Sequence, residues 1–79
     1  MHLPVELLET FVTVAETKNF TAAGKRIHRS QSAVSMQMKR LTEIVGNPLF
    51  DGNGRRIRLS PMGELLLDHA RKILKVHES

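Results

Sequence analysis

The chain has 79 residues, a formal net charge of +4 and 41% hydrophobic residues, which predicts one small domain with a marginal core. It contains no cysteine, and this excludes disulfides, thiolate metal sites and zinc fingers. No uncharged stretch approaches the roughly 20 residues that span a bilayer, and the N-terminus lacks the apolar segment of a signal peptide. We expect a soluble, cytoplasmic protein that gains stability from association between chains.

Two helices are predicted in the first part of the chain. The first begins at Pro4, which suits an initial helical turn, and ends near Asn19, which tolerates a left-handed conformation. The second has Thr21 as its N-cap and reaches about His28. Gly24 inside the second helix costs about 1 kcal/mol relative to Ala. A close approach between this helix and the following one would explain the glycine, and a tolerated local weakness is the alternative.

The third predicted helix covers residues 31–45 and has two unlike faces. Ser30 is its N-cap and Gly46 is a natural stop. One apolar stripe repeats at helical spacing: Val34, Met38, Leu41 and Val45. The opposite face is mostly small and polar or charged: Ser32, Ser35, Met36, Lys39, Arg40 and Glu43. A helix with such a face fits a DNA major groove, so residues 21–40 are interpreted as a helix-turn-helix.

A hairpin and a last helix follow. The Asn-Gly pair at 53–54 is a strong hairpin signal, and in the alternating segment after it Ile57 and Leu59 face the core. Ser60 and Pro61 then start a helix that reaches about residue 77. The order of elements predicts a mainly α, winged helix-turn-helix fold, with a three-helix core, a two-stranded β-hairpin wing and a C-terminal linker helix.

Positive charge is concentrated around the predicted recognition unit. Eight basic and two acidic residues lie between Lys25 and Arg58, whereas the rest of the chain has four basic and six acidic residues. Binding to a polyanion requires such a distribution. A solvated basic face is the alternative explanation.

The last predicted helix has more apolar surface than one domain covers. A coiled-coil-like seam follows alternating 4-3 spacing: Met62, Leu66, His69, Ile73 and Val76. We expect this seam to hold a homodimer, which would set two recognition helices about one turn of DNA, roughly 34 Å, or a multiple apart on a two-fold symmetric site. A terminal helix packed wholly on its own domain is the alternative.

A series of spaced motifs resembles the LysR-type transcriptional regulators. The motifs are Leu8-x-x-Phe11-x-x-Val14-Ala15-Glu16, Phe20-Thr21-Ala22-Ala23, Ser30-Gln31-Ser32-Ala33-Val34-Ser35, Leu41, Gly46-x-Pro48-Leu49-Phe50, Gly54-Arg55, Leu59-Ser60 and Gly63. The resemblance covers residues 3–63, and the segment 28–38 is most similar to a subgroup that regulates motility and virulence.

The resemblance implies a bacterial winged helix-turn-helix DNA-binding domain at residues 3–60, with its wing at 49–59 and a linker or dimerisation helix at 61–79. It also implies a homodimer through the linker helix and a higher oligomer in the full-length protein, which continues into a domain that binds a small-molecule effector. No cofactor is expected within these residues. The chain ends without a helix stop signal, as a chain cut just after the linker would.

The expected DNA contacts lie in the helix-turn-helix and the wing: Thr21, Arg29, Gln31, Ser32, Ser35, Met36, Lys39, Arg40, Arg55 and Arg56. Gln31 and Ser32 stand at a helix N-terminus, which favours phosphate, and Gln31 can also pair with adenine. Lys39 and Arg40 are expected to clamp phosphates. For the hydroxyl and amide residues, a plain cap or surface role is the alternative.

Three positions depart from the family pattern. Gly52 stands where Arg is usual, so the wing loses a cation. Met36 stands where many members have Arg, and its apolar side chain suits a thymine methyl rather than a guanine. Thr42 replaces a common Glu, which removes an acidic partner from the helix surface.

A winged helix used as a protein-interaction module is the alternative function, and it predicts an apolar or acidic outer face on the third helix. Catalysis is not expected, because no histidine–acid pair is positioned to activate a serine and no glycine-rich phosphate loop is present. The four histidines are scattered, so no metal site is expected.

Overall fold

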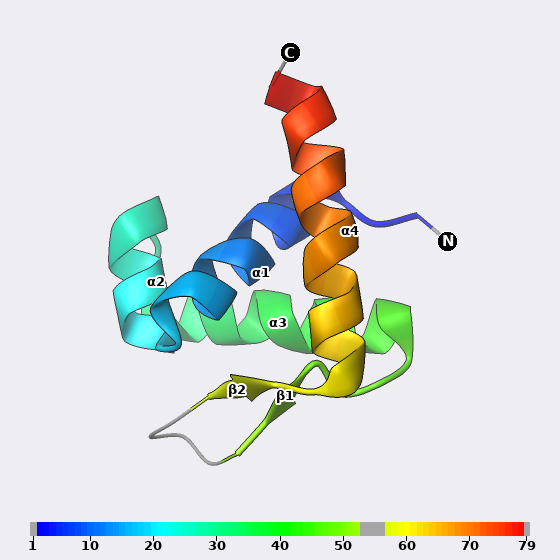
Figure 1. Ribbon diagram of the computed structural model, residues 1–79. Helices are drawn as coiled ribbons and strands as arrows, with labels where there is room; N and C mark the ends of the chain where they lie inside the picture. The colour runs from blue at the N-terminus through cyan, green and yellow to red at the C-terminus, as the bar shows by residue number, and fades with distance from the viewer. Residues whose placement is uncertain (1, 53–56, 79) are drawn as a thin grey trace.

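The computed structural model describes residues 2–52 and 57–78. Within them, four helices and a two-stranded antiparallel sheet follow in the order α1 (Val5–Thr17), α2 (Phe20–Ile27), α3 (Gln31–Val45), β1 (Phe50–Asp51), β2 (Arg58–Leu59) and α4 (Pro61–Glu78) (Figure 1). Helices α2 and α3 form the predicted helix-turn-helix, the strands form the wing, and α4 is the linker helix. The predicted winged helix-turn-helix fold is therefore confirmed.

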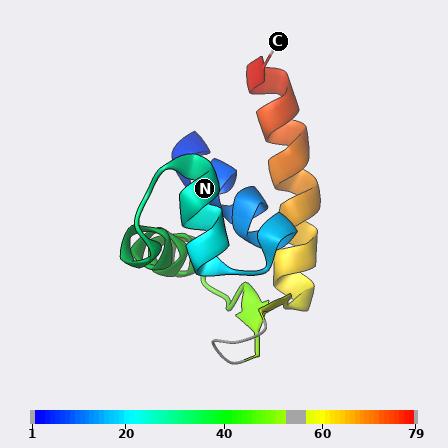
Figure 2. The ribbon, with the colours of Figure 1, turned by 90° about the vertical axis from the view of Figure 1, so that its left-hand side faces the viewer.

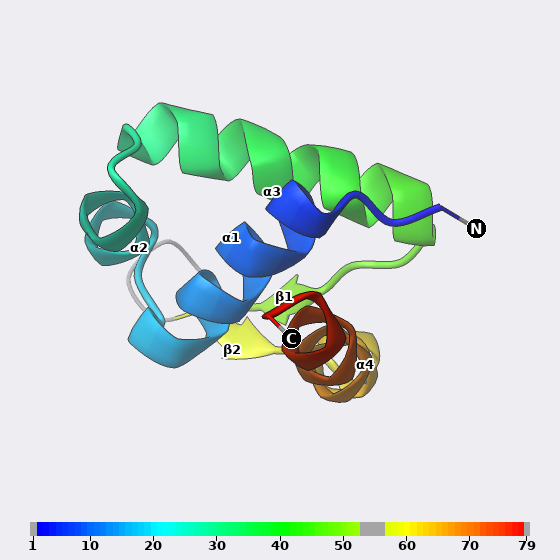
Figure 3. The ribbon, with the colours of Figure 1, turned by 90° about the horizontal axis from the view of Figure 1, so that it is seen from above.

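Helix α1 lies at the centre of the core. Seen from above, it runs between α3 and α4, with α2 across one end (Figure 3). Its apolar residues recur every three or four positions, and Leu8, Phe11 and Val14 are fully buried. Leu66 and Ala70 of α4 belong to the same buried cluster. The predicted ranges 3–60 and 61–79 therefore contribute to one shared core.

The start of α2 differs from the prediction. Asn19, rather than Thr21, is the N-cap, and its Oδ1 accepts a hydrogen bond at 2.8 Å from the backbone amide three positions on. Lys18, rather than Asn19, takes the left-handed conformation after α1, with φ 56°. Asn caps helices at least as well as Thr. An earlier start also places Phe20 in the first turn, where its ring meets the ring of Phe50 at 6.0 Å.

Gly24 packs against the turn between α2 and α3. His28 ends α2 in the left-handed conformation, with φ 60°. Ser30 caps α3 as predicted, accepting a hydrogen bond from the Ala33 amide at 3.1 Å. A Cβ atom on Gly24 would lie 2.4 Å from the carbonyl oxygen of Arg29. The close approach explains this glycine, because only a residue without Cβ lets the turn backbone pass so near.

The wing is short and is anchored by aromatic contacts. Phe50 on β1 pairs with Leu59 on β2. The Phe50 ring lies 5.6 Å from the ring of Phe11 and 6.0 Å from that of Phe20, measured between centroids. The strands lie at the foot of α4, on the same side of the molecule as the first turn of α2 (Figures 1 and 2). The wing is thus held beside the helix-turn-helix.

Ser60 joins the wing to α4. Its buried hydroxyl donates to the Pro48 carbonyl at 2.7 Å and accepts from the Gly63 amide at 3.0 Å. A Cβ atom on Gly63 would lie 2.1 Å from the carbonyl oxygen of Leu49. The start of α4 is therefore pressed against the wing backbone, and its C-terminal half extends beyond the other helices (Figure 2).

Replacing Gly24 by Ala tests the close approach at the turn. In an exposed helix this change would stabilise by about 1 kcal/mol. Here we expect a net loss of about 1–3 kcal/mol, because the methyl group displaces a backbone carbonyl, and thermal unfolding will show a lower Tm. Lys25→Ala, on the exposed side of α2, is the control and should change stability by less than about 0.5 kcal/mol. A higher Tm for Gly24→Ala would contradict the packing argument.

Candidate nucleic-acid interface

Helix α3 buries one side and exposes the other. Val34, Met38 and Leu41 are buried, as the predicted stripe requires, and Val45 is half-buried. Five of the predicted DNA contacts on α3 are exposed and the sixth, Ser35, is half-buried; the exposed residues are Gln31, Ser32, Met36, Lys39 and Arg40. The helix therefore presents a polar face with two cations, one exposed acid, Glu43, and one exposed apolar side chain, Met36.

A hollow of about 390 Å³ lies between the first turn of α2, the first turn of α3 and the wing. Thr21, Gln31 and Ser35, which are separate in sequence, line it together with Gly52. Helix N-termini carry backbone N–H groups without intrahelical partners, and these groups attract phosphate. Because Asn19 caps α2, the Thr21 hydroxyl is not needed as a cap. Three predicted contacts thus meet in one hollow, where two helix N-termini attract phosphate and the Asp51 carboxylate of the wing opposes it.

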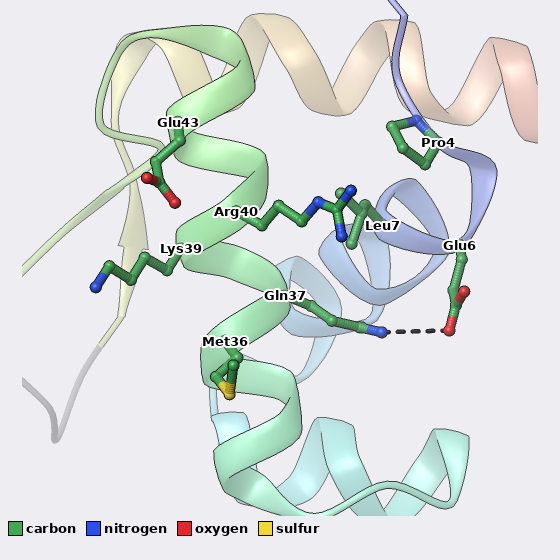
Figure 4. A pocket seen from close by; sticks show the side chains of 8 residues that line it. All are labelled: Pro4, Glu6, Leu7, Met36, Gln37, Lys39, Arg40 and Glu43. Atoms are coloured by element: carbon green, nitrogen blue, oxygen red, sulfur yellow. Dashed lines mark hydrogen bonds between the residues drawn. The ribbon is translucent and has the colours of Figure 1, made fainter.

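A second groove, of about 860 Å³, lies between α3 and the N-terminal end of α1. In Figure 4, Lys39 points toward the side of the wing, whereas Arg40 points toward Leu7 on α1. The Met36 side chain lies between those of Lys39 and Arg40 around the helix and is 73% exposed. The two cations therefore flank the exposed face of α3. This arrangement lets each meet a different wall of a DNA groove.

Arg29 is engaged with α1. Its Nη2 atom lies 2.5 Å from Oε1 of Glu6. Gln37 Nε2 donates to the same carboxylate oxygen at 3.3 Å. Glu6 and Gln37 are not among the predicted site residues, and no local pattern reveals them, because Glu6 is 23 positions from Arg29 and 31 from Gln37.

The predicted wing contacts Arg55 and Arg56 lie outside the described residues. Arg58 is described and exposed, but it lines a different hollow, with Lys18 and Glu64 among its neighbours. Gly52, where the family pattern has Arg, borders the hollow between the wing and α3. From the described part of the wing, that hollow is lined by Phe50, Asp51, Gly52 and Ile57.

One residue of the predicted dimerisation seam on α4, Leu66, does not lie at the surface of the domain. Leu66 is 6% exposed and packs in the core of its own domain. Met62 and Ile73 are half-buried against that core. The large hydrophobic residues that the described part of α4 exposes are Leu65 at 55% and Val76 at 74%. The sequence shows apolar residues around most of α4, and the docking of Gly63 and Ala70 decides which side turns inward.

Two further observations concern residues 2–52 and 57–78. Within them, no three His, Asp or Glu side chains are grouped so that they could hold a metal ion. The helices of this part are also too short or too polar to cross a membrane.

Sequence comparison identifies relatives of this chain. The family described as "Bacterial regulatory helix-turn-helix protein, lysR family" matches residues 5–64. The HTH-type transcriptional regulator DgdR of Burkholderia cepacia is 47% identical over 76 residues, which are 96% of this chain and 26% of DgdR. PecT of Dickeya dadantii is 44% identical over 78 residues, 99% of this chain and 25% of PecT. The chain thus spans about a quarter of the length of these relatives.

Solved structures share the fold. The CbnR_DBD–DNA complex matches with a TM-score of 0.92 and 36% identity, covering 96% of this chain and 87% of that chain. Vibrio fischeri DarR in complex with DNA matches with a TM-score of 0.92 and 32% identity, covering 99% of this chain and 27% of DarR. The four helices, the wing and the matched profile agree, and the chain belongs to the lysR family of bacterial regulatory helix-turn-helix proteins.

Proposed function

We propose that this chain binds double-stranded DNA in a sequence-specific manner, as the N-terminal domain of a bacterial LysR-type transcriptional regulator. The observation that carries the proposal is the exposed face of α3, where hydroxyl, amide and cationic side chains adjoin the hollow formed with α2 and the wing. The relatives DgdR and PecT are transcriptional regulators, and the CbnR and DarR structures contain DNA, which supports the same role here.

The proposed contacts divide by position. Lys39 and Arg40 clamp the backbones on the two flanks of α3, and Met36 between them meets a thymine methyl. The hollow at the first turns of α2 and α3 takes a phosphate or a base edge through Thr21, Gln31 and Ser35. Ser32, outside that hollow on the exposed first turn of α3, takes a phosphate at the helix N-terminus. Arg55 and Arg56 stay predicted contacts of the wing. We leave Arg29 out of this set, because its guanidinium is paired with Glu6.

The alternative function, a protein-interaction module, predicts an apolar or acidic outer face on α3. The exposed Lys39 and Arg40 do not favour it. A catalytic role is not proposed, since the relatives are called regulators. The proposal places the protein in the bacterial cytoplasm with the chromosome. A small-molecule effector would bind in the further length that the relatives have and this chain does not span.

We propose in addition that two chains associate through α4, so that their recognition helices meet a two-fold symmetric site, and that full-length chains form a higher oligomer. The contact surface is the exposed side of α4, which carries Leu65, His69 and Val76. Residues four and seven positions apart share a helix face. Met62 and Ile73, half-buried on the core side, border this surface, whereas Leu66 is excluded from it.

Replacing Ser32 by Glu separates DNA binding from folding. Ser32 is the second residue of α3, where a negative charge favours the helix by about 0.3–1 kcal/mol. The same charge repels phosphate, and a like-charge contact costs several kcal/mol. We expect an unchanged or higher Tm together with a loss of duplex affinity of at least about tenfold, measured by fluorescence anisotropy.

Thr42→Glu is the matched control for Ser32→Glu. It adds the same charge to the same helix, near its other end, at the position where the family commonly has Glu. We expect this variant to keep most of the affinity. If Ser32→Glu binds duplex DNA as tightly as Thr42→Glu does, the first turn of α3 does not approach the DNA and the proposed interface is wrong.

Leu65→Ala and Leu66→Ala test the two sides of α4. The buried Leu66 should cost about 2–5 kcal/mol of unfolding free energy when truncated, seen as a lower urea midpoint. Leu65→Ala should leave the monomer's stability within about 0.5 kcal/mol and weaken self-association in sedimentation equilibrium. Normal self-association of Leu65→Ala would remove the exposed side of α4 from the dimer contact.

A further inference from the structure

Glu6 on α1 connects to both the turn and the recognition helix through one carboxylate oxygen. Oε1 accepts from Arg29 Nη2 at 2.5 Å and from Gln37 Nε2 at 3.3 Å, and Figure 4 shows the second contact. The other end of the Gln37 amide, Oε1, accepts from the buried Thr10 hydroxyl at 2.5 Å. One acid in the first turn of α1 thus engages the turn and α3 together.

These hydrogen bonds among Glu6, Thr10, Arg29 and Gln37 fix the orientation of two polar side chains of the helix-turn-helix, Arg29 and Gln37. The nitrogen of the Gln37 amide faces Glu6 and its oxygen faces Thr10, so both ends of the amide are occupied on the α1 side of α3. Gln37 is therefore turned away from a base edge, although its neighbour Met36 is 73% exposed.

For DNA binding, the pairing of the Arg29 charge matters more than the orientation of Gln37. Arg29 immediately precedes Ser30, the N-cap of α3, where free backbone N–H groups already attract phosphate. An unpaired guanidinium at this place would add one cation to that attraction. The pairing with Glu6 cancels its charge locally, while both side chains stay about half exposed, at 44% for Arg29 and 59% for Glu6. An ion pair this exposed adds little to folding stability.

We propose that Glu6 is a positioning residue that withholds Arg29 from the DNA backbone and so weakens the sequence-independent part of duplex binding. The inference rests on the proposed DNA-binding function. Each phosphate that a cation neutralises releases counterions and steepens the dependence of affinity on salt. Because Arg29 is paired with Glu6, it neutralises no phosphate and releases no counterions. The base contacts of α3 then account for a larger share of the binding free energy.

The test is binding of the 79-residue chain to a duplex of mixed sequence, measured by fluorescence anisotropy over a series of salt concentrations. Glu6→Gln removes the charge, while its side-chain oxygen can still accept from Gln37. We expect affinity to rise several-fold at low salt and the slope of log affinity against log salt to steepen by about 0.9. The double variant Glu6→Gln/Arg29→Gln, which removes both charges of the pair, should restore the affinity and the slope of the unmodified chain.

Glu9→Gln is the matched control. It removes the same charge one turn further along α1, and Glu9 forms no ion pair with any described residue. We expect its slope to match that of the unmodified chain. Equal steepening in Glu6→Gln and Glu9→Gln would show a general charge effect and overturn the proposal.

Three other results would also decide the question. A lower affinity and a flatter slope in the double variant than in the unmodified chain would overturn the inference, because Arg29 then contacts phosphate although it is paired with Glu6. A lower Tm with an unchanged slope in Glu6→Gln would assign Glu6 a purely structural role and overturn it as well. Failure of the unmodified chain to bind any duplex would instead remove the proposed function itself, which is a separate outcome.

Discussion

Helix α1 is enclosed by the three other helices, each of which packs against it. This is possible because its apolar residues cover a broad side of the helix, and Leu8, Phe11 and Val14 lose all contact with water. A chain of 79 residues without cysteine depends mainly on such burial to offset the entropy of folding. The positions of the recognition helix, the wing and α4 therefore all depend on this central helix.

Two backbone contacts then fix the directions of the outer elements. Because Gly24 has no Cβ atom, the carbonyl oxygen of Arg29 can lie directly against α2, and this contact constrains the angle between α2 and α3. Gly63 lets the carbonyl of Leu49 approach the start of α4, which sets the direction in which α4 leaves the wing. Each contact joins two functional parts through main chain, and side-chain repacking cannot replace it.

Acidic residues of α1 also form ion pairs with α2, α4 and the turn before α3. Oε1 of Glu16 lies 2.9 Å from Arg26 on α2, and its Oε2 lies 3.7 Å from Arg71 on α4. Glu6, at the other end of α1, engages the turn and α3. The central helix therefore supplies both the apolar surface on which the others pack and the carboxylates that neutralise cations at its two ends. The cations left exposed on α3 are Lys39 and Arg40.

The sequence by itself determined the fold class, the bounds of α3, its cap at Ser30 and the start of α4 after Ser60. These features depend on periodicity and on hydrogen bonds between residues at most four apart, so local patterns carry them. The cap of α2 was misplaced by two residues because Asn19 and Thr21 are both good N-cap residues, so the local sequence did not decide between them. Only the tertiary structure decided that Leu66 faces inward, since adjacent helical residues differ by about 100° and α4 is apolar on several sides. It alone decided that Arg29 pairs with Glu6, because packing of α1 on the turn brings distant charges together.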